Sequence, residues 1–179
     1  GERPLVLIVF YRSYLTAHDL DPFVALHGAL ERRGFDTLSI FAPSLKAQEV
    51  RRQMDEWVRA LAPAAIVNAT AFSARGEDGD TPLDGAGVPV FQIALATSGR
   101  DAWAAASRGL SPADLAMHVV LPEIDGRILA GVASFKEASE RDPDLAFSRG
   151  VHRADLGRVE AIAERVAGWI ALAQKPAGE

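Results

Sequence analysis

Polar side chains gather in three short segments, each of which directly follows an apolar run typical of a buried strand. These segments are 11–14, 68–70 and 96–100. Their tyrosine, arginine, asparagine and threonine side chains can donate hydrogen bonds to a ligand. In an open α/β sheet, ligands bind beyond the carboxyl ends of the strands. The three segments are therefore the candidate site loops.

The motifs of several familiar catalytic sites are absent from the sequence. No GxGxxG or GxxxxGK[ST] pattern could cradle a phosphate, no HExxH could hold a metal ion, and no GxSxG could carry a nucleophilic serine. A phosphoacceptor (receiver) domain has carboxylates at the ends of its first and third strands, and here those places are occupied by residues 11–13 and Asn68. The four histidines are far apart. The sequence thus predicts no catalytic residue, no resident metal ion or cofactor, and no ATP site.

Composition narrows the class of protein. The chain has 179 residues, of which 49% are hydrophobic, a net charge of −5 and no cysteine. Absence of cysteine excludes disulfides and thiolate metal sites, and fits a reducing compartment, so we expect a cytoplasmic location. Basic residues are scattered, and no apolar run approaches the roughly 20 residues that span a bilayer, so neither nucleic acid nor a membrane is an expected partner. A first residue other than methionine indicates a segment of a longer protein.

Strands and helices alternate along the predicted chain. The continuous apolar run at 5–10 is typical of a strand buried on both faces, so it should lie centrally. Its neighbours should be 35–41 and 64–68, with 88–94 beyond the latter. Helices are predicted from residue 21, from a Ser44 cap to Pro63, at 99–107 and 112–117 after Ser98 and Ser111 caps, and at 153–173.

Two further segments connect these elements. Segment 70–87 is rich in glycine and acidic residues, and we expect a long surface loop that is mobile until other domains cover it. Asp125-Gly126 lies between apolar runs at 119–121 and 128–134, which predicts an edge hairpin.

The expected fold is α/β: a doubly wound, mostly parallel, flavodoxin-like sheet of about five strands with helices on both faces, plus a C-terminal hairpin and long helix. We expect a single domain over 1–179, with a core at 4–137 and an extension at 127–174.

One long segment, 101–128, resembles the large subunits of aerobic cobaltochelatase and, more loosely, of magnesium chelatase, which share a W…SxGLxPxD…LPExDG pattern. Blocks at 10–14, 68–73, 88–92 and 134–136 add to the resemblance in the same order. Arg-Ile after Asp-Gly and the later Ser-Phe-Lys look closer to the cobalt branch. The histidine- and glutamate-containing segment of the complete subunits has no counterpart here, which indicates a fragment.

The resemblance implies a domain of the tetrapyrrole-binding subunit of an ATP-dependent ligase that inserts Co²⁺ into hydrogenobyrinic acid a,c-diamide in cobalamin biosynthesis. Implied partners are this corrinoid substrate, the rest of the large subunit, and two AAA-type subunits that use ATP and Mg²⁺. The isolated chain should be inactive. Alternatives are the equivalent domain of a magnesium chelatase acting on protoporphyrin IX, or a non-catalytic α/β scaffold.

The resemblance also suggests site residues, because a broad anionic macrocycle suits arginines and aromatic rings. The substrate-binding candidates are Arg12, Tyr14, Asn68, Thr70, Arg100, Trp103 and Arg108. Candidates for a docking surface or for the metal route are Glu123, Asp125 and Arg127. Each has a structural alternative: arginines paired with carboxylates such as Asp114, Trp103 anchoring a short helix, and a turn at Asp125 with Glu123 and Arg127 paired across it.

Overall fold

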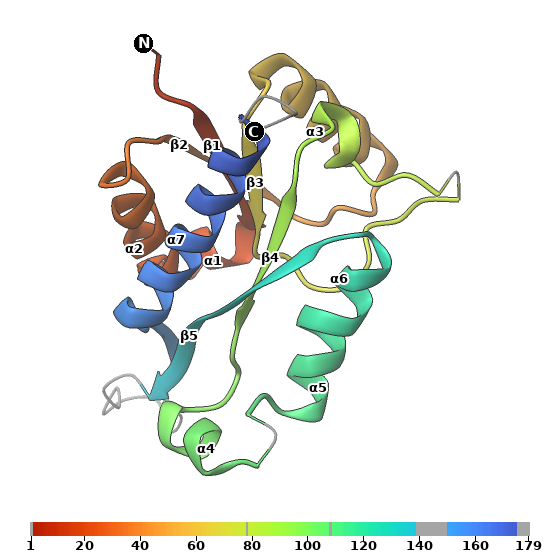
Figure 1. Cartoon of the computed structure of the whole chain (residues 1–179). Coiled ribbons are helices and arrows are strands. Elements are labelled where there is room, and N and C mark those ends of the chain that lie inside the picture. Colours follow the sequence, from red (N-terminus) through yellow and green to blue (C-terminus); the bar gives the residue numbers. More distant parts are fainter. Residues whose placement is uncertain (1, 78, 108, 139–149, 175–179) are drawn as a thin grey trace.

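One sheet of six strands organises the computed structural model, which describes residues 2–77, 79–107, 109–138 and 150–174 (Figure 1). The strand order is β2-β1-β3-β4-β5-β6. The bounds are β1 (Leu5–Tyr11), β2 (Asp36–Ala42), β3 (Ala65–Asn68), β4 (Val90–Leu95), β5 (Ile128–Ala138) and β6 (Gly150–Ala154).

The topology confirms the predicted doubly wound sheet and gives it one strand more. β1 pairs in parallel with both β2 and β3, β4 lies beyond β3, and β5 pairs in parallel with β4. Only β6 runs antiparallel, to β5, among the described strands. The strand order reverses between β1 and β3, which is the point where doubly wound sheets bind ligands.

Helices cover both faces of the sheet (Figure 1). α2 (Asp21–Glu31) and α7 (Leu156–Ala173) lie together on one face, while α3 (Gln48–Leu61) lies on the other. The remaining elements are α1 (Arg12–Thr16), η1 (Asp84–Ala86), α4 (Arg100–Ala105), α5 (Pro112–Leu115), the π-helix η2 (Ala116–Val120) and α6 (Leu121–Ile124). No helix in the described ranges is long and apolar enough to cross a membrane.

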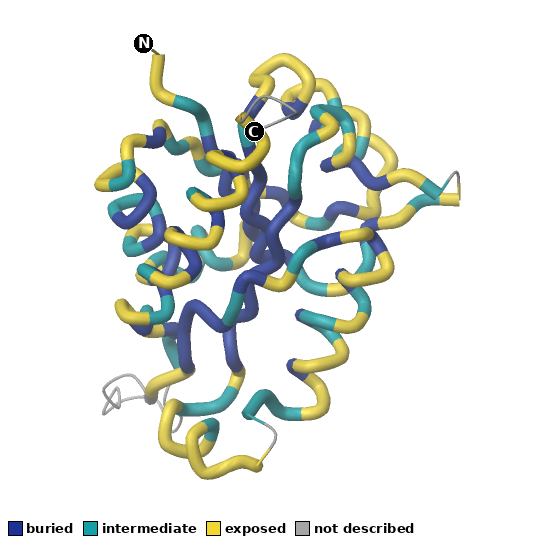
Figure 2. The backbone as a smooth tube through the Cα atoms, in the orientation of Figure 1, coloured by how far each residue is buried: buried dark blue, intermediate teal, exposed yellow. Residues whose placement is uncertain are grey.

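Alternation along β1 divides the core into two layers. Val6, Ile8 and Phe10 pack toward α2 and α7, whereas Leu7 and Val9 pack toward α3. Burial is therefore concentrated in the central strands (Figure 2). The central position predicted for β1 follows from this two-sided burial.

The hairpin predicted around residues 122–126 is wrong. Residues 112–124 form one continuous helix of α5, η2 and α6, and β5 pairs in parallel with β4 instead of folding back on 119–121. A short apolar run fits a helix as well as a strand, so periodicity could not separate the two. The antiparallel pair lies further along the chain, between β5 and β6.

Helix caps were predicted with mixed success. The Ser111 hydroxyl accepts the Asp114 N–H at the start of α5, as expected. α3 begins after Ala47 and α4 after Gly99, both without a side-chain cap. Ser44 instead accepts the N–H of Lys46 within a local turn. Pro122, inside a helix, has no N–H to donate, which accounts for the wider π turn before it.

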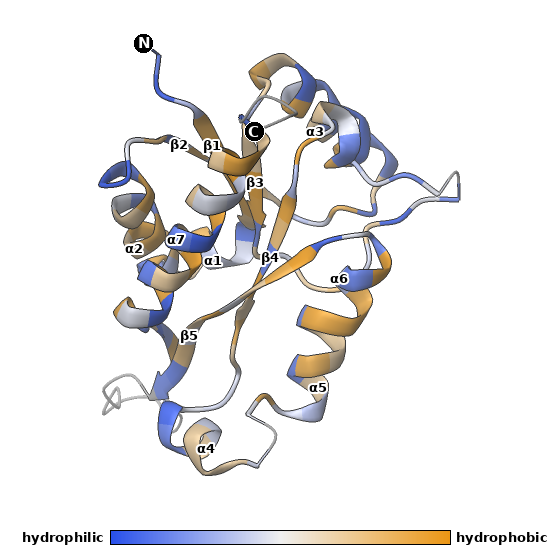
Figure 3. Cartoon of the chain, viewed as in Figure 1, coloured by the Kyte–Doolittle hydropathy of each residue, from blue (hydrophilic) through white to orange (hydrophobic). Residues whose placement is uncertain are grey.

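Helix 112–124 has an unusual distribution of side chains. Asp114 and His118 point inward and are buried, whereas Leu115, Val120 and Ile124 are exposed. Much of this helix is accordingly coloured as hydrophobic in Figure 3. The inward carboxylate is satisfied, since it accepts hydrogen bonds from the N–H and hydroxyl of Thr97.

Candidate functional site: the crevice between the first and third strands

A crevice of about 300 Å³ opens where the strand order reverses. Its walls come from the ends of three strands: Tyr11 from β1, residues 44–46 after β2, and residues 71–74 after β3. Tyr11 lies at the floor with its side chain only partly exposed. This is the position that the topology predicts for a ligand.

Tyr11 fixes the first residue of the crevice loop. Its hydroxyl donates to the Ala71 carbonyl at 2.9 Å and accepts the Ala71 N–H at 3.1 Å. Burial raises the pKa of Tyr11, so the phenol remains a donor at neutral pH. One phenol therefore satisfies both backbone groups of Ala71.

Phe72, the next residue, is held in an uncommon conformation. Its φ is 65°, in the left-handed region, and its side chain is 45% exposed. A non-glycine residue there costs about 1–3 kcal/mol and persists where its surroundings impose it. The surroundings include the Met117 carbonyl, which accepts the Phe72 N–H at 2.8 Å.

The π-helix explains why the Met117 carbonyl is available. Leu121 donates its N–H to Ala116, five residues earlier. The next bond in this register would run from Pro122 to Met117, and proline has no N–H. The proline of the Leu-Pro-Glu motif thus frees the acceptor that anchors Phe72.

Asp125 fixes the following part of the loop. Its buried carboxylate accepts hydrogen bonds from the Ser73 hydroxyl at 2.5 Å and the Ala74 N–H at 2.6 Å. The same carboxylate pairs with Arg127 at 3.2 Å, and Arg75 donates to the Ile124 carbonyl. The Asp-Gly segment is thus a clamp on the crevice loop as well as a turn.

A buried network of polar side chains supports this clamp from below. Arg127 Nη1 and Asn68 Nδ2 donate to Gln92 Oε1, at 3.2 and 2.7 Å. Thr70 donates to Asn68 Oδ1 at 2.9 Å, and Gln92 Nε2 donates to the Thr70 carbonyl at 2.7 Å. Burial lowers the pKa of Arg127, while the nearby Asp125 carboxylate opposes the shift. Loop residues 70–74 are therefore each held by a contact from another element.

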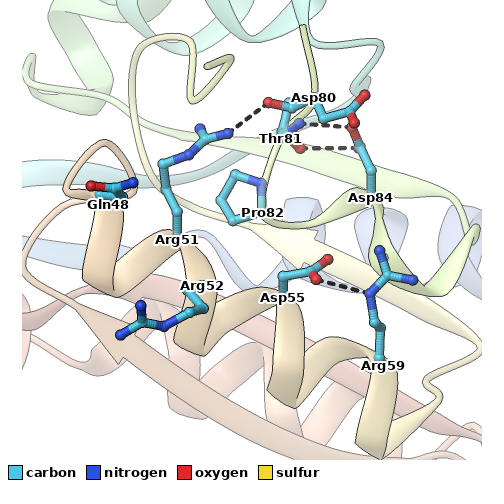
Figure 4. Close-up of a pocket in the computed structure, with 10 residues that line it drawn as sticks. Gln48, Arg51, Arg52, Asp55, Arg59, Asp80, Thr81, Pro82 and Asp84 are labelled. Atoms are coloured by element: carbon cyan, nitrogen blue, oxygen red, sulfur yellow. Dashed lines mark hydrogen bonds and ion pairs between the residues drawn. The ribbon is translucent and has the colours of Figure 1, made fainter. Parts of the chain in front are cut away.

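A groove lined by both basic and acidic side chains continues from the crevice along α3. It comprises a cavity of about 510 Å³ between α3 and residues 80–85, drawn in Figure 4, and one of about 670 Å³ between Lys46 and Glu77. Arg51 crosses it to the Ala74 and Asp80 carbonyls, and Arg59 pairs with Asp55 at 2.8 Å. The basic side chains bordering the crevice and groove are Lys46, Arg51, Arg52, Arg59 and Arg75.

Four of the predicted site residues meet in the buried network: Asn68, Thr70, Asp125 and Arg127. They support the crevice loop and are almost inaccessible to solvent. Glu123 is exposed on the same turn. Direct contact of any of them with substrate stays a prediction.

The other predicted residues lie elsewhere. Arg12 is exposed on α1, and Tyr14 packs edge-on against Phe23 and His152, where burial raises its pKa to about 12. Arg100 pairs with Asp155 at 2.8 Å. Trp103 packs on Phe135 beneath the Arg158 guanidinium, and Arg108 lies outside the described residues.

Three residues that line the crevice, Tyr11, Lys46 and Phe72, were not among the site residues predicted from the sequence. Tyr11 and Phe72 stood inside segments already singled out, so their position was available from the sequence. Nothing in the sequence marks a left-handed phenylalanine. Within the described part of the chain, no group of three or more histidine, aspartate or glutamate side chains could hold a metal ion.

Comparisons with known proteins converge on one family. A family model described as CobN/Magnesium Chelatase matches residues 1–179. The aerobic cobaltochelatase subunit CobN of a Sinorhizobium species is 37% identical over 94% of this chain, and that of Pseudomonas aeruginosa is 34% identical over 99%. The chloroplastic magnesium-chelatase subunit ChlH of Oryza sativa is 29% identical over 96%.

A solved structure agrees with these sequence relatives. The catalytic subunit of cobaltochelatase from Mycobacterium tuberculosis superposes with a TM-score of 0.79 and 26% identity, over 97% of this chain. This chain spans only 15% of that structure, and 13% and 14% of the two CobN sequences.

Proposed function

Because the chain belongs to the CobN/magnesium chelatase family, we propose that it forms one domain of the large subunit of an ATP-dependent cobaltochelatase. The complete enzyme would act in the cytoplasm and insert Co²⁺, as substrate, into hydrogenobyrinic acid a,c-diamide. Two AAA-type partner subunits would hydrolyse ATP with Mg²⁺. This domain would contribute to holding the corrinoid.

The observation that carries the proposal is the fixed presentation of Phe72. An exposed aromatic ring on a strained backbone is retained in the crevice by contacts from Tyr11, Met117 and Asp125. Backbone strain of this kind clusters at ligand-binding positions. A preorganised ring loses little entropy when a flat macrocycle packs against it.

Charge around the crevice suits the same ligand. A corrinoid substrate carries several carboxylate and amide side chains, and Lys46 borders both the crevice and the groove beside it. Charge-assisted hydrogen bonds from ammonium or guanidinium groups to carboxylates contribute about 1.5–3 kcal/mol each. The macrocycle would therefore rest at Phe72 with its periphery toward Lys46.

The domain supplies binding and orientation in this proposal, and the metal-insertion chemistry belongs to the remainder of the subunit. The four groups clamped below the crevice, Asp125, Arg127, Asn68 and Gln92, already contact one another. They would act as positioning residues for the loop. The substrate would instead contact side chains on the open side of the crevice loop.

Steady-state cobalt insertion by the complete subunit with its partner subunits tests the proposal. Lys46→Ala should lower kcat/KM for the corrinoid by about tenfold, equivalent to ~1.4 kcal/mol, and leave ATP hydrolysis by the partners unchanged. Arg32→Ala removes the same charge on the α2 side and should have no effect. Equal kcat/KM in parent and Lys46→Ala would remove the crevice from the substrate site.

The magnesium branch is a second candidate, supported by the 29% identity to the rice ChlH subunit. Its substrate, protoporphyrin IX, is also flat but carries fewer carboxylates. Titrating the complete subunit with both rings separates the branches, since the cobalt enzyme should favour the corrinoid. If neither ring bound, the domain would be a scaffold.

A further inference from the structure

The outer edge of β2 is open and apolar. β2 is the first strand of the sheet, and no strand in the described ranges pairs with its outer side. Asp36 donates its N–H inward to Pro4. Because backbone direction alternates, the N–H and C=O groups of Thr37, Ser39 and Phe41 face outward.

Side chains beside this edge form an apolar groove of about 480 Å³ between β2 and α3. Leu38 and Phe41 of β2 are 42% and 46% exposed, and Trp57 and Leu61 of α3 are 44% and 36% exposed. Of the apolar side chains along α3, only Met54 and Val58 are fully buried, whereas Trp57 and Leu61 are partly open to solvent. Part of the apolar face of α3 thus remains uncovered.

The opposite edge of the sheet, formed by β6, is covered by side chains that bond to its backbone. On β6, the N–H groups of His152 and Ala154 donate to the carboxylates of Asp19 and Asp21, each at 2.8 Å. Edge strands are commonly blocked in such ways, by charges, proline or covering side chains. Residues 37–42 of β2 contain no charged residue and no proline. The β2 edge therefore lacks the protection that the β6 edge has.

We propose that the β2 edge is completed by an extended apolar segment from another part of the same large subunit, which adds to the sheet as a seventh strand. This goes beyond the proposed corrinoid site, and rests on the premise that the chain is one part of a longer subunit. The chain spans only 13% and 14% of its two CobN relatives, so the added strand would come from the remaining part of a subunit of that length. Main-chain hydrogen bonds would join β2, and apolar side chains would fill the groove against Trp57 and Leu61.

Hydrogen–deuterium exchange on the complete subunit tests this directly. The amides of Thr37, Ser39 and Phe41 should exchange at least ~100-fold more slowly than in an unstructured chain, and those of Leu38 and Ile40 should do so through their pairing with β1. Leu38→Lys, which places a charge in the groove, should speed exchange of the three outer amides selectively. Leu172→Lys, at another exposed apolar position on α7, is the control and should leave them unchanged.

The exchange rates of the outer β2 amides either support or overturn the added strand. Fast exchange of the outer amides in the parent subunit would overturn the proposal, even if corrinoid binding and cobalt insertion were intact. Protection that rises with protein concentration, together with a dimer in sedimentation, would assign the edge to a second copy and also overturn it. Protection that is independent of concentration and lost in Leu38→Lys supports an added strand from the same subunit.

Discussion

The Asp125 carboxylate lies 2.6 Å from the Ala74 amide nitrogen, although 51 residues separate them in sequence. This contact joins the turn after α6 to the loop after β3. It gives the Asp-Gly motif a physical role, because the motif both reverses the chain before β5 and holds the crevice loop.

Asp125→Asn should destabilise the protein by about 3 kcal/mol, because it leaves the buried Arg127 guanidinium without its counter-charge. Urea unfolding followed by circular dichroism would measure the change. Glu123→Gln, an exposed carboxylate on the same turn, is the control and should change stability by less than ~0.5 kcal/mol. Equal stability of Asp125→Asn and parent would mean that the clamp contributes nothing.

Phe72→Gly should be more stable than Phe72→Ala by about 1 kcal/mol, since glycine adopts a φ of 65° without the steric cost that alanine keeps. Both variants lose the same ring, so their difference isolates the backbone. Thermal or urea unfolding of the pair provides the measurement. If alanine were the more stable of the two, Phe72 would not be under the strain inferred from its conformation.

Stability should fall as the pH is lowered from about 7.5 to 5.5, with His118 as one cause. Burial lowers the pKa of His118, the Asp114 carboxylate opposes this, and His152 adds to it. Because the pKa is lowered in the folded state, the unfolded chain takes up the proton first as the pH falls. The contribution of His118 to folding stability is therefore present above the ordinary histidine pKa and is lost as the pH falls below it. Burial lowers the pKa of His27 as well, which adds a loss of the same sign.

His118→Gln should therefore flatten the pH dependence, by up to ~1.4 kcal/mol per pH unit, without abolishing it. Urea unfolding at several pH values for parent and variant gives the two slopes. Identical slopes over this range would show that His118 titrates alike in the folded and unfolded states.

Arg100→Ala tests whether the corrinoid extends beyond the crevice to Arg100: a direct contact would make binding by the complete subunit weaker by about 1.5–3 kcal/mol while the ATPase of the partners is unchanged. The structure offers a competing role, because Arg100 pairs with Asp155. Arg100 is exposed, and its buried partner Asp155 keeps a second cation, Arg158 at 3.8 Å, so stability should fall by no more than ~1 kcal/mol. Unchanged affinity with reduced stability would make Arg100 purely structural.

The sequence predicted the sheet better than the crevice. The two-sided apolar run of β1 fixed its central place, and the lengths of the connections fixed parallel pairing. Residues 119–121 were misassigned because a three-residue apolar run has no period of its own. The edge strand β6 was missed for a similar reason: it is short, half-buried and interrupted by His152 and Arg153.

The candidate site was predicted by segment but not by residue. Position after a strand end selected the segments 11–14 and 68–70, and Phe72 lay just beyond the second, within the block 68–73 of the family resemblance. The contacts of Asp125 with Ser73 and of Pro122 with the π turn depend on how helix 112–124 packs, which no local pattern encodes. Lys46 carries no local signal at all, since it is one exposed lysine on a turn.

The most direct test of the central claim is calorimetric titration of the complete subunit with hydrogenobyrinic acid a,c-diamide, without metal ion or nucleotide. The parent should bind the corrinoid, Phe72→Ala should bind it about tenfold more weakly, and Phe72→Tyr, which keeps the ring, should bind with parental affinity. Equal affinity of Phe72→Ala and parent would contradict the claim that the crevice between β1 and β3 holds the macrocycle.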